Sequence, residues 1–230
     1  IAQHLMFLDL RNNRIASLPR RIFDGMRRMY YLDLTGNPVQ VIPSDTFHSM
    51  PNLGRLLIAD CGLSTLTARH FQEKPFLWQL EVDGNHFTYF APNVFNLPSL
   101  ENLGISANRI EMLDSASFGA SLASLTHISA INNRIHGVDS LLLSRVLYSL
   151  ELQGNLCTDY NFIDIQTNRE AVNMYLNGCF INFRRRNDLL RCEYQQYNQD
   201  YTCMLSINNA EGHNDFPRVD GDHLSERSNY

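Results

Sequence analysis

The chain has 230 residues, with 24 acidic and 19 basic side chains and a formal net charge of −5. This acidic excess gives little support to nucleic-acid binding, which depends on clustered Lys and Arg. The sequence holds no run of eighteen apolar residues, so it predicts no transmembrane helix in this chain.

Residues 1–156 repeat one pattern of apolar side chains at a nearly constant spacing. The first copy, over residues 5–15, reads Leu-x-x-Leu-x-Leu-x-x-Asn-x-Ile. The asparagine position recurs every 22 to 25 residues, and a cysteine occupies it once. Copies in register predict a solenoid, because a unit this small buries a core only when its neighbours stack against it. The residues at this position, here called the asparagine ladder, are Asn13, Asn37, Cys61, Asn85, Asn108, Asn133 and Asn155.

The Leu-x-Leu part of each copy predicts a short strand, because alternate residues of a strand point to the same side. Stacked strands then form a parallel sheet on the concave side of the solenoid. The ladder amide carries both a donor and an acceptor, so it can satisfy backbone groups where the chain turns inward. A buried Cys61 thiol is a weak donor that can replace it, and we expect this thiol to be structural and unpaired.

The outer side of each repeat is predicted to be irregular. Pro19 and Pro43 stand at matching positions of the return segment, where a fixed φ favours extended or short 3₁₀ structure. A large apolar residue also follows each ladder position by ten residues, which fixes the register of the core. These residues are Phe23, Phe47, Phe71, Phe95, Phe118 and Leu143.

This frame resembles the leucine-rich repeat family, and the 24-residue period with its outer Phe is similar to the typical extracellular subclass. The resemblance implies an α/β solenoid, a horseshoe with a parallel concave sheet. It also implies a secreted or cell-surface protein. Because the first repeat begins with no room for a cap, we expect the chain to be an incomplete or processed piece.

Residues 157–183 are expected to form a C-terminal cap. Thr167 and Glu170 have capping-box spacing, and we expect a helix from about residue 168 to 177. This segment resembles the cap of extracellular leucine-rich repeat proteins. A disulfide between Cys157 and Cys179 is expected to hold the helix over the last repeat.

Residues 184–230 are expected to form a linker and a β-hairpin module. Antiparallel pairing places Cys192 opposite Cys203 and Tyr194 opposite Tyr201, which suits a disulfide. The module resembles a segment of secreted leucine-rich repeat proteins of insects, notably mosquitoes. There it tends to precede a repeat array, so the resemblance suggests a junction with a second array.

The outward strand positions are where such a scaffold would hold a partner, and aromatic and charged residues gather in the first four repeats. The alternative is an ordinary solvated sheet face. Arg substitutions at Ser106 or Ser129, in later repeats, are expected to matter little. The predicted partner-binding residues are Phe7, Tyr31, Asp33, Arg55, Gln79, Glu81 and Asp83.

No catalytic or cofactor motif accompanies these repeats. The eight histidines show no zinc-site spacing, and there is no nucleophile elbow or phosphate-binding Gly loop. The densest polar cluster, around His213 and Asp215, is more typical of turns than of a metal site. We therefore expect no cofactor, no metal and no enzyme activity.

The function expected from the sequence is protein or other macromolecular recognition outside the cell. By family resemblance, innate immunity or cell adhesion are its expected settings. The alternative is an intracellular leucine-rich repeat adaptor, or a substrate receptor of a ligase. The oxidation state of the cysteines separates the two, because a reducing cytosol disfavours disulfides.

Overall fold

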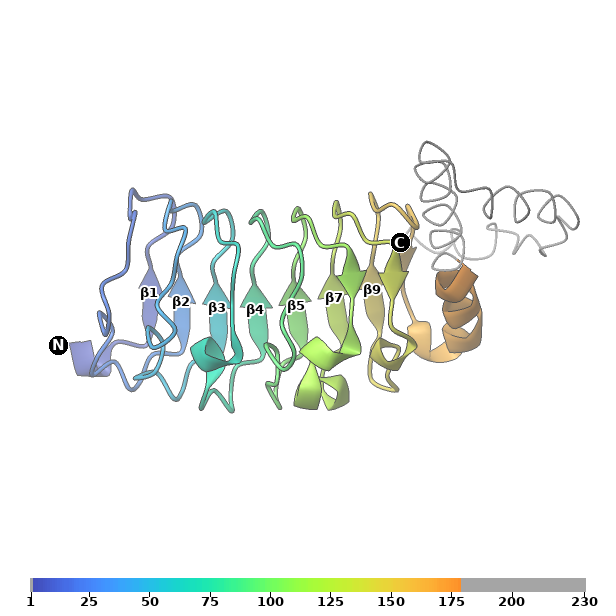
Figure 1. Ribbon diagram of the computed structural model, residues 1–230. Helices are drawn as coiled ribbons and strands as arrows, with labels where there is room; N and C mark the ends of the chain where they lie inside the picture. Colours follow the sequence, from blue (N-terminus) through green and yellow to red (C-terminus); the bar gives the residue numbers. More distant parts are fainter. Residues whose placement is uncertain (1, 179–230) are drawn as a thin grey trace, which may run out of the picture. The chain divides into compact units, whose positions relative to one another are not determined.

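The computed structural model describes residues 2–178, and within them each repeat contributes one three-residue strand to a continuous sheet. Figure 1 shows these strands side by side in chain order. The sheet has eight strands, and the first seven pair in parallel. The strands are β1 (Phe7–Asp9), β2 (Tyr31–Asp33), β3 (Arg55–Leu57), β4 (Gln79–Glu81), β5 (Asn102–Gly104), β7 (His127–Ser129), β9 (Ser149–Glu151) and β10 (Asn161–Phe162).

The register agrees with the repeat pattern, which confirms the predicted solenoid. The middle residues of neighbouring strands lie opposite one another, as Leu32 does with Leu56 and Leu56 with Leu80. All three are fully buried, and the residues that flank them point outward. Each inward side chain therefore adds to one core that runs through the stack, and the flanking columns remain for other uses.

The asparagine ladder joins each repeat to the one before it. The side-chain nitrogen of Asn85 donates to the carbonyls of Ile58 (2.9 Å) and Val82 (2.8 Å), and its oxygen accepts from the amide of Leu63 (2.9 Å). Buried backbone groups at each inward turn are thereby satisfied, which avoids the cost of unpaired polar groups. Asn37, Asn108, Asn133 and Asn155 repeat this arrangement.

Cys61 fills the ladder position only in part. Its thiol is buried and free, and it donates to the carbonyl of Leu34 at 3.3 Å. A thiol offers no good acceptor for the amide of the preceding repeat, so the Val39 N–H turns to the Asn37 carbonyl at 2.8 Å. The expected structural role of Cys61 is thus confirmed, with one local rearrangement of the backbone.

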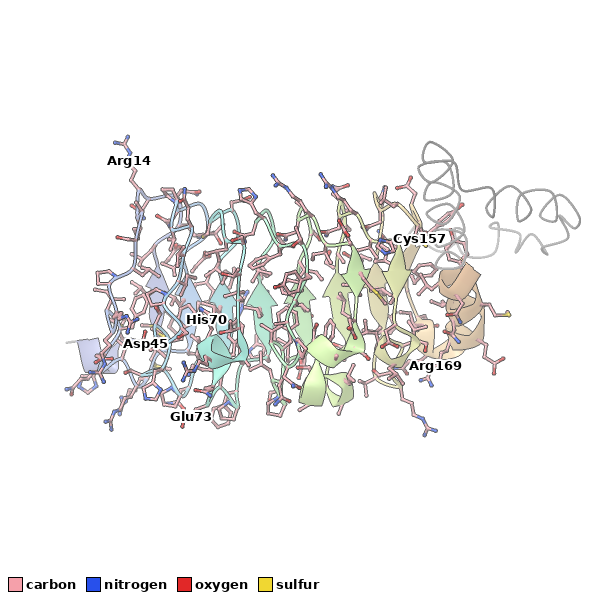
Figure 2. The ribbon with its side chains drawn as sticks, in the orientation of Figure 1. Arg14, Asp45, His70, Glu73, Cys157 and Arg169 are labelled. Carbon is pink, nitrogen blue, oxygen red and sulfur yellow. The ribbon has the colours of Figure 1, made fainter. Side chains whose placement is uncertain are left out.

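The outer side of the stack is built from turns, short 3₁₀ segments and buried aromatic rings. Side chains fill the space between the sheet and these outer segments (Figure 2). The Phe95 and Phe118 rings, from successive repeats, lie 5.4 Å apart, and both side chains are buried. The 3₁₀ segments are η1 (Ala2–His4), η2 (Ala68–Phe71), η3 (Ser115–Ser117), η4 (Gly119–Ala123) and η5 (Ser140–Leu142), with a small parallel sheet of β6 (Met112–Leu113) and β8 (Gly137–Val138).

An antiparallel strand and a helix follow the last repeat. β10 pairs antiparallel with β9, and a helix covers 165–178. The predicted start of this helix is wrong by three residues: Thr167 lies inside it and donates its hydroxyl to the Asp164 carboxylate at 2.8 Å. Val172 and Leu176 are buried, as a cap requires. No helix within residues 2–178 is long and apolar enough to cross a membrane.

Cys157 is disulfide-bonded. Its predicted partner Cys179 lies outside the described residues, so that pairing stays a prediction. The hairpin module, with Cys192 and Cys203, and the polar cluster around His213 also lie outside them.

Candidate partner-binding face

Two neighbouring regions stand out on the outward face of the sheet. The first, here called the aromatic–arginine cluster, consists of Phe7, Tyr30, Tyr31, Arg55 and Trp78. The second, here called the carboxylate hollow, is lined mainly by polar side chains from β4 to β9. Its polar lining residues are Gln79, Glu81, Asp83, Asn102, Ser106, His127, Ser129, Ser149 and Glu151.

Arg55 is the centre of the aromatic–arginine cluster. Its guanidinium carbon lies 5.2 Å from the ring centre of Tyr31 and 5.5 Å from that of Trp78. Both distances are within the range of a cation–π contact. The indole N–H of Trp78 donates to the Tyr30 hydroxyl at 2.9 Å, and the Phe7 ring lies 6.0 Å from the Tyr30 ring. The rings hold Arg55 in one place on a solvent-facing surface.

The charge of Arg55 is not matched by this part of the chain. No carboxylate within residues 2–178 lies at ion-pair distance from it, and its Nε is buried without a hydrogen-bond partner. A buried donor of a charged group that lacks a partner costs free energy, so such an atom is uncommon in folded proteins.

Asp33 does not have the role that the sequence predicts for it. It is fully buried, and its carboxylate accepts from the Tyr31 hydroxyl and the Thr35 amide, both at 2.9 Å. The Arg11 Nε also lies 3.4 Å from it. Asp33 therefore cannot touch a partner, and the prediction that it does is wrong. Its contribution is to hold the ring of Tyr31 in place.

The remaining predicted contacts are accessible. Phe7 is 62% exposed, while Tyr31, Arg55, Gln79, Glu81 and Asp83 are partly exposed. The structure divides them between the two regions, since Phe7, Tyr31 and Arg55 belong to the cluster and the others line the hollow.

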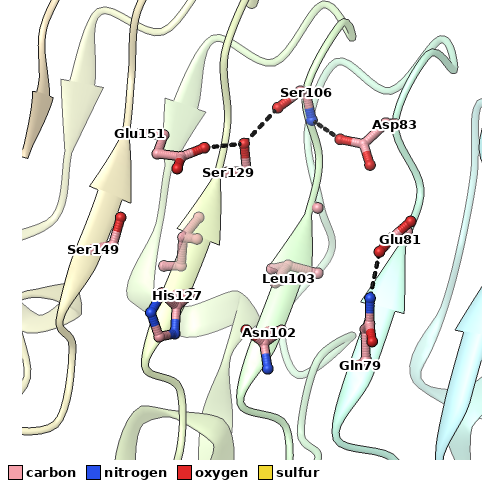
Figure 3. A pocket seen from close by; sticks show the side chains of 12 residues that line it. Gln79, Glu81, Asp83, Asn102, Leu103, Ser106, His127, Ser129, Ser149 and Glu151 are labelled. Atoms are coloured by element: carbon pink, nitrogen blue, oxygen red, sulfur yellow. Dashed lines mark hydrogen bonds between the residues drawn. The ribbon is translucent and has the colours of Figure 1, made fainter. Parts of the chain in front are cut away.

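The carboxylate hollow is an open depression of about 490 Å³. Figure 3 shows its side chains converging from β4, β5, β7 and β9. The pKa of Asp83 is raised to about 6, mainly by burial and also by the nearby Glu81 charge, while the Ser106 amide that donates to Asp83 opposes this rise. Glu81 in turn accepts from the Gln79 amide.

A chain of hydroxyl groups crosses the hollow. The Ile131 amide donates to the Ser106 hydroxyl (3.0 Å), and the Ser129 hydroxyl donates to Glu151 (2.6 Å). The two hydroxyls lie 3.0 Å apart, so Ser106 donates to Ser129 because the Ser129 proton is already engaged. Ser106 and Ser129 are thus part of an ordered network, and they are unsuitable as the neutral positions that the sequence suggests.

Tyr30 and Trp78 are the residues that sequence reasoning misses. They stand one position before β2 and β4, outside the columns that flank the core leucines. Gly54 occupies the same column between them, and the Tyr30 ring lies over it. A Cβ at Gly54 would come within 2.4 Å of that ring. An aromatic–Gly–aromatic pattern at 24-residue spacing was the available signal.

Residues 2–178 contain no group of three or more His, Cys, Asp or Glu side chains placed to hold a metal ion. The arrangement instead offers rings, one unmatched cation and an adjacent acidic depression, which are the elements of a binding surface.

Comparison with known proteins supports the repeat assignment. The sequence model of the family described as "Leucine rich repeat" matches residues 3–63 and 27–87. Decorin from Oryctolagus cuniculus is 31% identical over 116 residues, covering 49% of this chain and 31% of decorin. The chain therefore spans about a third of the length of this curated relative. This vertebrate relative does not confirm the insect-type resemblance, which stays a prediction.

Solved structures share the fold. The TLR13–ssRNA13 complex aligns with a TM-score of 0.62 and 26% identity, over 66% of this chain and 22% of that one. The Toll–Spatzle complex of Drosophila aligns with a TM-score of 0.59 and 25% identity, over 66% and 21%. The chain has the fold of a leucine-rich repeat solenoid.

Proposed function

We propose that this chain is a non-enzymatic recognition module, secreted or exposed at the cell surface, whose concave sheet binds a protein partner. The observation that carries the proposal is Arg55, a cation that is held between aromatic rings on an outward face and has no ion-pair partner among residues 2–178. Aromatic and Arg side chains are the residues most often found at the energetic centre of protein interfaces.

An extracellular setting has two lines of support. Cys157 is disulfide-bonded, and disulfides persist in oxidising compartments. Decorin is a secreted extracellular protein, and the Toll–Spatzle complex is described as a hub in development and innate immunity. Innate immunity or cell adhesion are accordingly the settings that we propose, ahead of an intracellular adaptor or ligase substrate receptor.

A protein partner fits the charges of this face better than a nucleic acid does. Its accessible outward residues include four carboxylates against two guanidinium groups, and one of the latter, Arg11, is already paired with Asp9. The accessible carboxylates are Asp9, Glu81, Asp83 and Glu151. Phosphate groups would be repelled by most of this surface. Because the TLR13 structure contains single-stranded RNA, RNA is included as a competitor in the test.

Site-specific photocrosslinking tests where partners bind. A benzophenone amino acid replaces either Phe7, on the concave face, or Tyr89, which is 70% exposed in the return segment after β4. In extracellular fluid of the source organism, Phe7 is expected to give protein crosslinks that excess unlabelled chain suppresses. Crosslinking from Tyr89 alone, or competition by single-stranded RNA, would contradict the proposal.

Alanine substitutions then measure the contribution of the cluster. Tyr31→Ala and Arg55→Ala are each expected to weaken binding of the captured partner by more than about 1 kcal/mol. Tyr89→Ala is the matched aromatic control and is expected to leave the affinity unchanged. Equal affinity of all three variants would move the interface away from the concave face.

A further inference from the structure

The unmatched donor of Arg55 indicates more than a generic contact surface. Three side-chain atoms within residues 2–178 are buried without a hydrogen-bond partner: Thr46 Oγ1, Arg55 Nε and Arg169 Nε. Only Arg55 combines this with cation–π contacts on the outward face of the sheet. Its neighbours within residues 2–178 fix the side chain but supply no acceptor to the guanidinium. The Nε atom itself is buried, but the Arg55 side chain is partly exposed, so an acceptor that the partner brings can reach the exposed part.

We propose that Arg55 binds a carboxylate of the partner protein, an Asp or Glu side chain whose neighbours along the partner are neutral or basic. This inference rests on the proposed function and specifies the chemistry of the partner. A carboxylate matches the planar fork of a guanidinium, because its two oxygens can accept from two N–H groups at once.

The charges around Arg55 limit what can bind there. On one side lie Asp9 and Asp33 with Arg11, and on the other lie Glu81 and Asp83. A polyanion such as a sulfated glycan or RNA would place further negative charges over these carboxylates, which disfavours it. A single carboxylate with neutral or basic neighbours gains the contact with Arg55 and avoids that repulsion.

The cluster also shields the contact from water. Tyr31 and Trp78 are partly buried, and Trp78 is held by its hydrogen bond to Tyr30. A charge-assisted hydrogen bond is worth more where water is partly excluded. The same rings provide apolar walls for the methylene groups of a Glu side chain.

Two spectroscopic signals report on this site directly. Trp78 is the single tryptophan of the chain, so its fluorescence changes when the environment of Arg55 changes. The Nε–H group of Arg55 gives its own resonance in a ¹⁵N NMR spectrum. The full 230-residue chain is titrated with the blocked peptide acetyl-Lys-Ala-Ala-Glu-Ala-amide, and in parallel with its Gln analogue.

The expected result is a saturable shift of the Arg55 Nε–H resonance with the Glu peptide, and a response at least about tenfold weaker with the Gln analogue. Arg55→Gln is expected to abolish the Trp78 response. Arg55→Lys keeps the charge but loses the planar fork, so it is expected to bind at least about threefold more weakly. Arg134→Gln, at an exposed arginine in the loop after β7, is the matched control and is expected to respond as the unmodified chain does.

Three results would overturn the inference. One is equal response to the Glu and Gln peptides, and another is no response up to about 20 mM peptide, where even very weak binding is detectable. The third is a stronger response to a heparin hexasaccharide or single-stranded RNA, which would make Arg55 a polyanion site. Crosslinking from Phe7 is independent of these measurements. If Phe7 crosslinks to a protein while the peptide titration fails, the concave interface stands and only the carboxylate assignment is lost.

Discussion

The two halves of the concave face share one backbone frame but have opposite surface chemistry. β1–β3 present rings around a cation, whereas β4–β9 present carboxylates joined by hydroxyl groups. Both halves pair in the same register, with middle residues that point toward the core and flanking residues in the outward columns. The comparison shows that the repeat frame constrains the inward column and leaves the outward columns to be set by function.

The pKa values of one carboxylate in each half are shifted in opposite directions. Hydrogen bonds from Arg11 hold the pKa of Asp9 below its usual value, while burial raises the pKa of Asp83 to about 6. One half therefore stabilises an ionised carboxylate, and the other stabilises a protonated one.

The largest effect is expected for Gly54→Ala, which would disrupt the aromatic half. The Gly54 backbone is fixed on both sides. Its N–H donates to the backbone carbonyl of Tyr30, and its carbonyl accepts from the backbone N–H of Trp78. The new methyl group would therefore displace the Tyr30 ring and break its hydrogen bond with Trp78. Urea unfolding should show a loss of about 2–3 kcal/mol, the cost of overpacking a fixed site.

A double-mutant cycle checks the cause of this loss. In a Tyr30→Ala background, where the ring is absent, Gly54→Ala should cost much less. An equal cost in both backgrounds would show that the strain lies in the backbone and not against the ring.

The second effect concerns Asp83 and has a defined pH dependence. The folded-state pKa of about 6 lies above the ordinary value of 3.8, so the folded chain holds this proton more tightly than the unfolded chain does. The resulting stabilisation is complete below pH about 3.8 and is lost as the pH rises through about 6. Asp83→Asn keeps an acceptor for the Ser106 amide and has no charge to bury.

This variant should match the unmodified chain at pH about 3.5 and exceed its stability at pH about 7.5 by about 1–2 kcal/mol. The gain is smaller than the full pKa difference implies, because the side chain is partly exposed and water screens its charge. Urea midpoints at the two pH values measure it. A variant less stable than the unmodified chain at the higher pH would contradict the raised pKa.

A smaller effect is expected for Tyr31→Phe, which removes one of the donors to the buried Asp33. The Thr35 amide and Arg11 remain as partners, so the expected loss of stability is about 1 kcal/mol. Tyr89→Phe, at an exposed tyrosine, is the control and should change nothing. A neutral result at Tyr31 would mean that the rings alone hold the cluster.

The smallest effect is expected for Asp9→Asn, and its sign is opposite to that of Asp83→Asn. The Asp9 and Arg11 side chains are both about half exposed, so water screens their pairing. Because the pKa of Asp9 is lowered in the folded state, its contribution is present above its usual value and lost as the pH falls. The variant should be slightly less stable near neutral pH and equal to the unmodified chain in strong acid.

The strands and the core were predictable from sequence because one physical requirement repeats in every copy. An inward leucine such as Leu56 must be buried, and the ladder asparagine must satisfy the turn, so seven copies report the same register. The outward columns carry no such repetition. Their chemistry depends on contacts between repeats, as between Tyr30 and Trp78, 48 residues apart.

Two errors of sequence reasoning have the same origin. Asp33 stands in an outward column but is buried, because Tyr31 and Arg11 cover it. The terminal helix begins before Thr167, because Ile165 is needed in the core and Asp164 turns the chain with a positive φ of 53°. In both places tertiary packing decides the outcome, and the repeat pattern alone does not contain that information.

The antiparallel pairing of β10 has a consequence for how such an array grows during evolution. Duplication of a repeat unit adds a strand parallel to its neighbours, and such a strand must find a free edge. At β9 that edge is already occupied by a strand of opposite direction. A repeat added directly after β9 would therefore have to displace β10 before its own strand could extend the parallel sheet.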